Sequence, residues 1–149
     1  MDEQAYRQRY KQLNSCPCVF EKAVLSNRCT CKYSQRLLIA EREAGACTLQ
    51  QAQFDCQALI EVLRENAKFA LKLTHIPGSL PHGKEVKVQV GGLLGLQACM
   101  DPGQVTATQV IDVQALVRMA KLRYGSLEQL PFSDIVKHIL NYQHRKRRK

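Results

Sequence analysis

The spacing of apolar residues predicts a chain built mainly from helices. Apolar side chains recur every three or four residues along several segments, which places them on one face of a helix. The longest such pattern runs from residue 48 to 73, where Ala52, Leu59 and Leu63 belong to one apolar stripe. Helices are predicted, in chain order, at residues 3–13, 19–25, 33–44, 48–73, 112–124 and 132–142.

One segment alternates between apolar and polar residues instead. In EVKVQV, residues 85–90, three valines occupy every second position, which predicts a strand. The following GGLLGLQACM fits either the second strand of a hairpin, turning at Gly91–Gly92, or a helix, and we favour the helix. The fold class expected is therefore mainly α: a small helical domain with a cysteine-rich N-terminal loop region and at most a minor strand or hairpin near residues 85–98.

The chain length and the positions of Gly and Pro favour a single domain that spans residues 1–149. Two Pro and two Gly between residues 74 and 84 predict a loop inside it. The other regions expected are a cysteine-rich, metal-binding region at 14–56, C-terminal helices at 107–143 and a basic tail at 144–149.

The composition and the N-terminal residues indicate where in the cell the protein is expected. Apolar residues make up 45% of the chain and charged residues 23%, so an aliphatic core can form without any Trp. The first residues are polar and of mixed charge, unlike a signal peptide, and no apolar run is long enough to span a membrane. We therefore expect a cytoplasmic protein whose thiols are reduced and which does not associate with membranes.

The cysteines are the main chemical signal. Two Cys-x-Cys pairs, Cys16 with Cys18 and Cys29 with Cys31, stand ten residues apart in CPCVFEKAVLSNRCTC. Each pair can direct two sulfurs at one centre, and the intervening segment is long enough to turn the second pair back. Four soft thiolates suit zinc or an iron–sulfur cluster, whereas Ca²⁺ and Mg²⁺ prefer oxygen.

Two further thiols leave the ligand set open. Cys47 lies at a junction between predicted helices, and Cys56 lies on the inner stripe of the longest one. Either the four cysteines of the pairs are the ligands, or one cysteine from each pair joins Cys47 and Cys56. Cys56 can also be a small buried apolar residue, and Cys99, which has no partner at ligand spacing, is expected to fill the core.

Three features favour an iron–sulfur cluster, [4Fe–4S] or [2Fe–2S], over zinc. Six thiols between residues 16 and 56 exceed what one zinc ion needs. No histidine lies near them, since the four are at positions 75, 82, 138 and 144. Apolar residues surround the pairs, and an apolar shell protects and tunes a cluster. Structural Zn²⁺ and a metal-free protein with reactive thiols or disulfides remain the alternatives.

We thus expect a small metalloprotein acting in electron transfer or in redox or gas sensing, with a protein partner and no catalytic residues of its own. The competing hypothesis is a structural zinc module that serves as a nucleic-acid-binding or protein adaptor. The net charge of +9 supports an anionic partner, because residues 69–149 hold twelve Lys and Arg against five Asp and Glu. The residues expected to contact nucleic acid are Arg145, Lys146, Arg147, Arg148 and Lys149.

Overall fold

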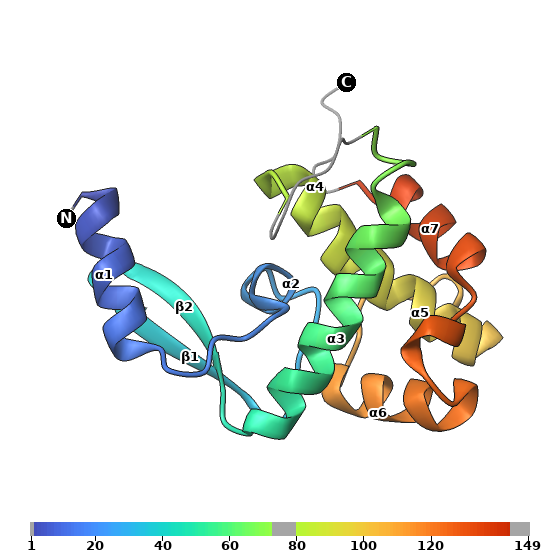
Figure 1. Cartoon of the computed structure of the whole chain (residues 1–149), viewed down its shortest axis with the longest axis horizontal. Helices are drawn as coiled ribbons and strands as arrows, with labels where there is room; N and C mark the ends of the chain where they lie inside the picture. The colour runs from blue at the N-terminus through green and yellow to red at the C-terminus, as the bar shows by residue number, and fades with distance from the viewer. Residues whose placement is uncertain (1, 73–79, 144–149) are drawn as a thin grey trace.

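The protein is mainly helical, as predicted, with one antiparallel hairpin in the part of the chain that the structure describes (Figure 1). This computed structural model describes residues 2–72 and 80–143. The elements are, in chain order, α1 (Glu3–Leu13), α2 (Glu21–Leu25), β1 (Ser34–Ile39), β2 (Arg42–Cys47), α3 (Gln50–Ala67), α4 (His82–Val86), the π-helical turn η1 (Lys87–Gly91), α5 (Gly92–Met100), η2 (Pro102–Gln104), α6 (Val113–Tyr124), η3 (Leu127–Gln129) and α7 (Phe132–Asn141).

The hairpin and α1 form an arm beside the larger helical body (Figure 1). Strands β1 and β2 pair from Ser34 with Cys47 to Ile39 with Arg42, so only two residues make the turn. Helix α1 covers the hairpin through a small apolar cluster of Tyr6, Ile39 and Ala44. The open end of the hairpin, where Cys47 lies, leads directly into α3.

Helix α3 runs through the helical body and contacts α6, α7 and η1 (Figure 1). Its inward stripe is fully buried at Leu59, Ile60 and Leu63, as the apolar period predicted. Helices α6 and α7, predicted at 112–124 and 132–142, complete the core with buried residues such as Val117 and Ile139. Within the described residues, no helix is both long and apolar enough to cross a lipid bilayer.

Residues 82–100 form one continuous helical run made of α4, η1 and α5. The predicted strand at 85–90 is therefore wrong, as is a hairpin near 85–98, while the helix favoured after Gly91 is confirmed. The alternation was misleading because the middle of this run is buried on most sides: Val86, Val88 and Val90 are buried, and so is Gln89 between them. A segment buried all round shows no one-sided pattern of either period.

The predicted helix at 33–44 is also wrong, since these residues form β1, the turn and the start of β2. Ala40, in the turn, adopts a positive φ of 57°, a conformation more usual for Gly or Asn. The sequence thus lacks the usual hairpin signal. What stabilises the strands is tertiary: β1 pairs with one edge of β2, and the segment around Pro17 pairs with the other.

The longest helix is shorter than its pattern suggested, spanning Gln50–Ala67 rather than 48–73. Residues 68–72 continue as turns, and Lys72 has a positive φ of 57°. The predicted loop at 74–84 ends earlier than expected, because α4 begins at His82, and residues 73–79 lie outside the described part. The basic tail, residues 144–149, also lies outside it.

Candidate metal centre

The first Cys-x-Cys pair adds a short extended segment to the free edge of β2. The Cys18 N–H donates to the Gly45 carbonyl at 3.0 Å, and the Cys47 N–H donates to the Cys16 carbonyl at 2.7 Å. Pro17 and Ala46 form the bridge between these two bonds. In this antiparallel register Cys16 lies opposite Cys47, and Cys18 lies opposite Gly45. Side chains alternate along a strand, so all three thiols share one face.

The second pair reaches the same place from the other side of β2. The Ser34 N–H donates to the Cys31 carbonyl at 3.0 Å, which places Cys31 in the turn just before β1. Ser34 is the register partner of Cys47, so Cys31 lies near the same end of the hairpin. The Thr48 N–H, which donates to the Tyr33 carbonyl at 2.8 Å, fixes this end further.

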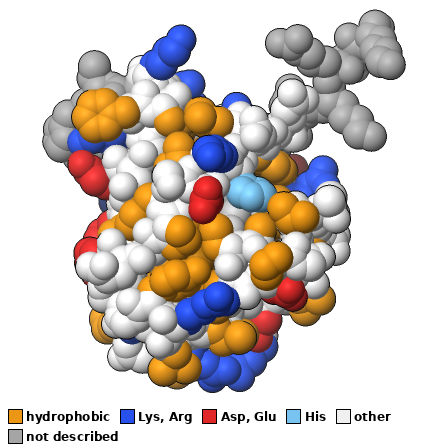
Figure 2. All heavy atoms as spheres, turned by 90° about the vertical axis from the view of Figure 1, so that its right-hand side faces the viewer, with side chains coloured by type: hydrophobic (Ala, Val, Ile, Leu, Met, Phe, Trp, Pro, Cys, Tyr) orange, Lys and Arg blue, Asp and Glu red, His pale blue; other side chains and the backbone are white. Residues whose placement is uncertain are grey.

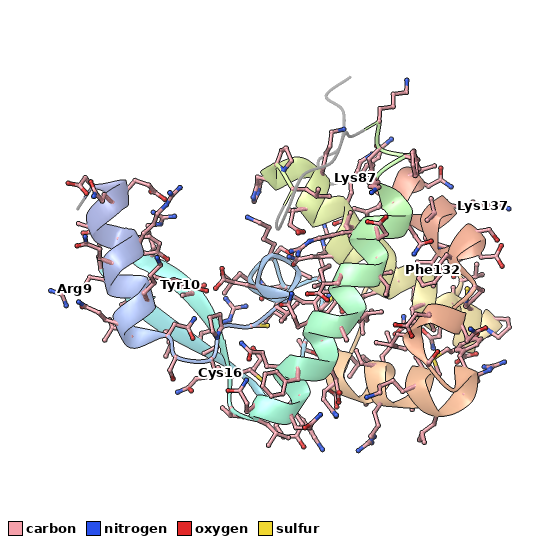
Figure 3. All side chains as sticks on the ribbon, viewed as in Figure 1. Arg9, Tyr10, Cys16, Lys87, Phe132 and Lys137 are labelled. Atoms are coloured by element: carbon pink, nitrogen blue, oxygen red, sulfur yellow. The ribbon has the colours of Figure 1, made fainter. Side chains whose placement is uncertain are left out.

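Helix α3 contributes the remaining thiol. Its first turns are joined to the extended segment, because the Gln53 side-chain amide donates to the Pro17 carbonyl at 2.7 Å. Cys56 follows less than one helical turn later and packs against the main core. Figure 3 shows the labelled Cys16 at this junction, between the hairpin and the start of α3.

Four thiols therefore approach one another from four segments. Burial raises the pKa of Cys18 to about 12, against a hydrogen bond from the Phe20 backbone, and nearby thiols add to the effect. The pKa of Cys56 is also raised, first by burial and then by the thiols of Cys18, Cys31 and Cys47. We call this set the four-thiol site: Cys18, Cys31, Cys47 and Cys56.

Two of the predicted ligands lie differently. Cys29 is 1% exposed within the main core, its backbone is bridged to Val110, and burial raises its pKa to about 12. Cys16 lies at the rim of the site and interacts with the thiol of Cys47. The thiols of Cys18, Cys31 and Cys47 all raise the pKa of Cys56, whereas Cys29 interacts with Cys18 and Cys16 interacts with Cys47.

The four-thiol site is defined by the electrostatic effect of its thiols on one another. Among the described residues, no three His, Cys, Asp or Glu side chains are arranged as ligands of one metal ion. The Cys47 thiol instead donates to the Leu49 carbonyl at 3.2 Å. The raised pKa values of Cys18 and Cys56 keep these thiols protonated at neutral pH, which makes them poor nucleophiles.

A polar network that the sequence did not reveal holds β2 in position. The Tyr10 hydroxyl and the Gly45 N–H both donate to the same Glu21 carboxylate oxygen, each at 2.8 Å. The Asn14 amide donates to the Gly45 carbonyl at 2.8 Å. A Cβ at position 45 would lie 3.3 Å from the Cys18 Cβ, so a glycine lets the two segments approach. The sequence suggested only that Gly45 ends a helix.

Gln89 connects the four-thiol site to the helical body. Its buried side chain, 3% exposed, accepts a hydrogen bond from the Ala23 N–H at 3.1 Å and donates to the Val19 carbonyl at 3.4 Å. Both partners lie close to Cys18 in sequence. The π-helical turn thus positions the segment that carries the first pair, and no sequence motif indicated this.

Gln89→Leu should lower the free energy of unfolding by about 1–3 kcal/mol, because the buried Ala23 N–H would lose its partner. Gln114→Leu is the matched control. Gln114 is also buried, but its side-chain oxygen has no hydrogen-bond partner, so its removal should change stability little. Urea unfolding of both variants measures the difference, and equal losses would contradict the role given to Gln89.

A second candidate lies between α5 and α7. A hollow of about 320 Å³ is lined by Ala98, Cys99, Pro102, Val105, Asp134, Lys137 and His138. Figure 2 faces this side of the molecule, where apolar side chains surround a histidine. Cys99, predicted to fill the core, is only partly buried here. Its carboxylate and ammonium neighbours, Asp134 and Lys137, lie 3.9 Å apart, so no single charge dominates the hollow.

Comparisons with protein-family models, curated proteins and solved structures return no match. Function is therefore argued from the chemistry and arrangement of the residues.

Proposed function

We propose that the four-thiol site binds an iron–sulfur cluster and that the protein acts in electron transfer or in redox or gas sensing. The observation that carries this proposal is the approach of four thiols from segments that are distant in sequence. One comes from each Cys-x-Cys pair, one from the end of β2 and one from α3. Packing alone does not require four thiols at one junction, and thiolates are the usual ligands of such clusters.

The surroundings support a negatively charged centre in an apolar shell. The Cys47 thiol lies just before the N-terminus of α3, an 18-residue helix whose first turn holds no acidic side chain. The positive end of the helix dipole there favours anions, including thiolates. Phe20 and Val24, both buried, pack in the same core as Cys18 and Cys56, and apolar packing limits access of water to a cluster.

Metal binding would also convert the protonated thiols to thiolates. A bound cation stabilises the thiolate form, so binding would release protons and offset the cost of burying the charges. The side chains would rotate to bring the sulfurs to the metal, because Cys47 now points its thiol at a backbone carbonyl. A cytoplasmic location, where thiols remain reduced, is part of the proposal.

The test is anaerobic reconstitution of the full chain with iron and sulfide, followed by a visible spectrum and by iron and sulfide analysis. A brown protein with equal amounts of iron and labile sulfide supports the proposal. A colourless protein holding one zinc ion per chain would instead support the competing structural zinc module, which four thiolates also suit.

Variants decide which thiols are the ligands. Cys47→Ser and Cys56→Ser should reduce bound iron to the background level, because each removes one of four ligands. Cys99→Ser is the matched control, since Cys99 lies in the hollow between α5 and α7 and should leave the iron content unchanged. Full iron content in Cys47→Ser and in Cys56→Ser would contradict the assignment. It would instead favour the four cysteines of the two Cys-x-Cys pairs as the ligands.

A further inference from the structure

Cys16 lies beside the four-thiol site without belonging to it, and its position suggests a separate role. It lies directly opposite Cys47 in the antiparallel pairing around Pro17 and Ala46. The Cys47 N–H donates to the Cys16 carbonyl at 2.7 Å, which joins the two residues by one backbone hydrogen bond. Residues directly opposite each other in antiparallel segments have Cα atoms about 4.5–5.5 Å apart, within the range that a disulfide spans.

The two thiols also influence each other electrostatically. Both thiols are partly exposed. The pKa of Cys16 is raised by burial, by the charge of the neighbouring Cys47 and by a hydrogen bond between the two thiols. Cys18, the other thiol of the pair, lies opposite Gly45 instead and is more deeply enclosed.

We propose that Cys16 and Cys47 form a reversible disulfide that removes Cys47 from the four-thiol site. The pairing itself follows from the geometry of the two segments, whereas its effect on a bound metal rests on the proposed function. Oxidation would leave three thiols in place of four, so the centre would lose its metal. The pair would thereby connect the thiol redox state of the surroundings to the occupancy of the site.

The chemistry is thiol–disulfide exchange with a small disulfide such as oxidised glutathione. The Cys47 thiolate attacks one glutathione sulfur, forming a mixed disulfide and releasing one glutathione thiolate. The Cys16 thiolate then attacks the Cys47 sulfur, forming the protein disulfide and releasing the second glutathione. Two protein thiols lose their protons and two electrons, and one glutathione disulfide is reduced to two glutathione molecules.

The full chain, free of metal, would be equilibrated anaerobically in buffers with different ratios of reduced to oxidised glutathione. Free thiols would then be labelled with a maleimide and counted from the intact mass. The count should fall by two from the seven of the reduced chain. Cys18→Ser is the matched control and should also lose two labels, whereas Cys16→Ser should lose none. A loss of two labels in Cys16→Ser would overturn the pairing.

The second measurement tests the connection to the metal, with Zn²⁺ alone as the probe. Binding and oxidation exclude each other if they share Cys47, so the coupling is reciprocal. Saturating Zn²⁺ should therefore shift the glutathione ratio at half-oxidation at least tenfold towards oxidising conditions. An unchanged ratio with zinc bound would overturn the connection. If the reduced chain binds neither zinc nor iron, the proposed function fails, while the label count still decides the disulfide.

Discussion

Arg64→Leu is expected to lower the free energy of unfolding by about 3–5 kcal/mol, among the largest effects of any single substitution in this protein. The guanidinium of Arg64 lies 2.5 Å from a carboxylate oxygen of Glu85, and its Nε donates to the same oxygen at 2.7 Å. The Glu85 side chain is 1% exposed. Without Arg64 its charge would remain buried with no partner, which costs far more than the pair itself contributes.

A double replacement separates the cost of an unpaired buried charge from the contribution of the ion pair itself. Arg64→Leu with Glu85→Leu removes both charges together and should recover most of the loss, because buried ion pairs are often replaceable by apolar residues. Arg7→Leu is the control for an exposed pair. Its partner Glu3 is 60% exposed and lies 3.6 Å away, so its loss should cost less than about 0.5 kcal/mol. Guanidinium unfolding measures all three, and a small loss in Arg64→Leu would contradict the expectation.

The ion pair is one of two polar contacts that anchor the run from 82 to 100 to the rest of the protein. Glu85 lies in α4, one turn after its start, and is tied to α3 by Arg64. Three residues past Val86, Gln89 is tied to the segment around α2. Residues four apart lie on the same face of a helix and of a strand alike, so these contacts fix the position of the run and not its secondary structure. Neither partner could be identified from the sequence alone.

The sequence predicted helices well wherever one face is apolar and the other polar. Helices α1, α6 and α7 have such faces, and each was predicted within about two residues of its ends. It failed for β1 and β2, because residues 33–44 contain good helix formers and the turn lacks Gly or Asn. Strand formation there depends on contacts with the segment around Pro17, which local sequence does not encode.

The same limit applies to the four-thiol site. Cysteine spacing predicted a metal region and left two alternative ligand sets, one of which contains the thiols of the four-thiol site. The pairing of Pro17 with Ala46 places Cys16 and Cys18 on one face of the sheet, and which of them lies inward depends on the segments that cover Cys18. Because β2 was predicted as part of a helix, this register could not be derived. The prediction of a metal centre itself stays a prediction.

Gly91→Ala should destabilise the protein by about 3 kcal/mol, since the helical run and α7 are in direct backbone contact there. A Cβ at position 91 would lie 2.7 Å from the Cα of Ile139 and 3.0 Å from the His138 carbonyl oxygen. These are backbone atoms, so no side-chain rotation relieves the clash, and α7 would have to move outward. Gly83→Ala is the matched control, because nothing lies within 4 Å of its added methyl group.

The helix propensity of alanine is more favourable than that of glycine by about 1 kcal/mol. Gly83→Ala should therefore leave the free energy of unfolding unchanged or raise it by up to that amount. The contrast between the two variants isolates the clash from helix propensity, because the substitution and the helical run are the same. Thermal unfolding measures it as a lower midpoint for Gly91→Ala alone. Equal midpoints would mean that α7 does not lie against the π-helical turn as closely as described.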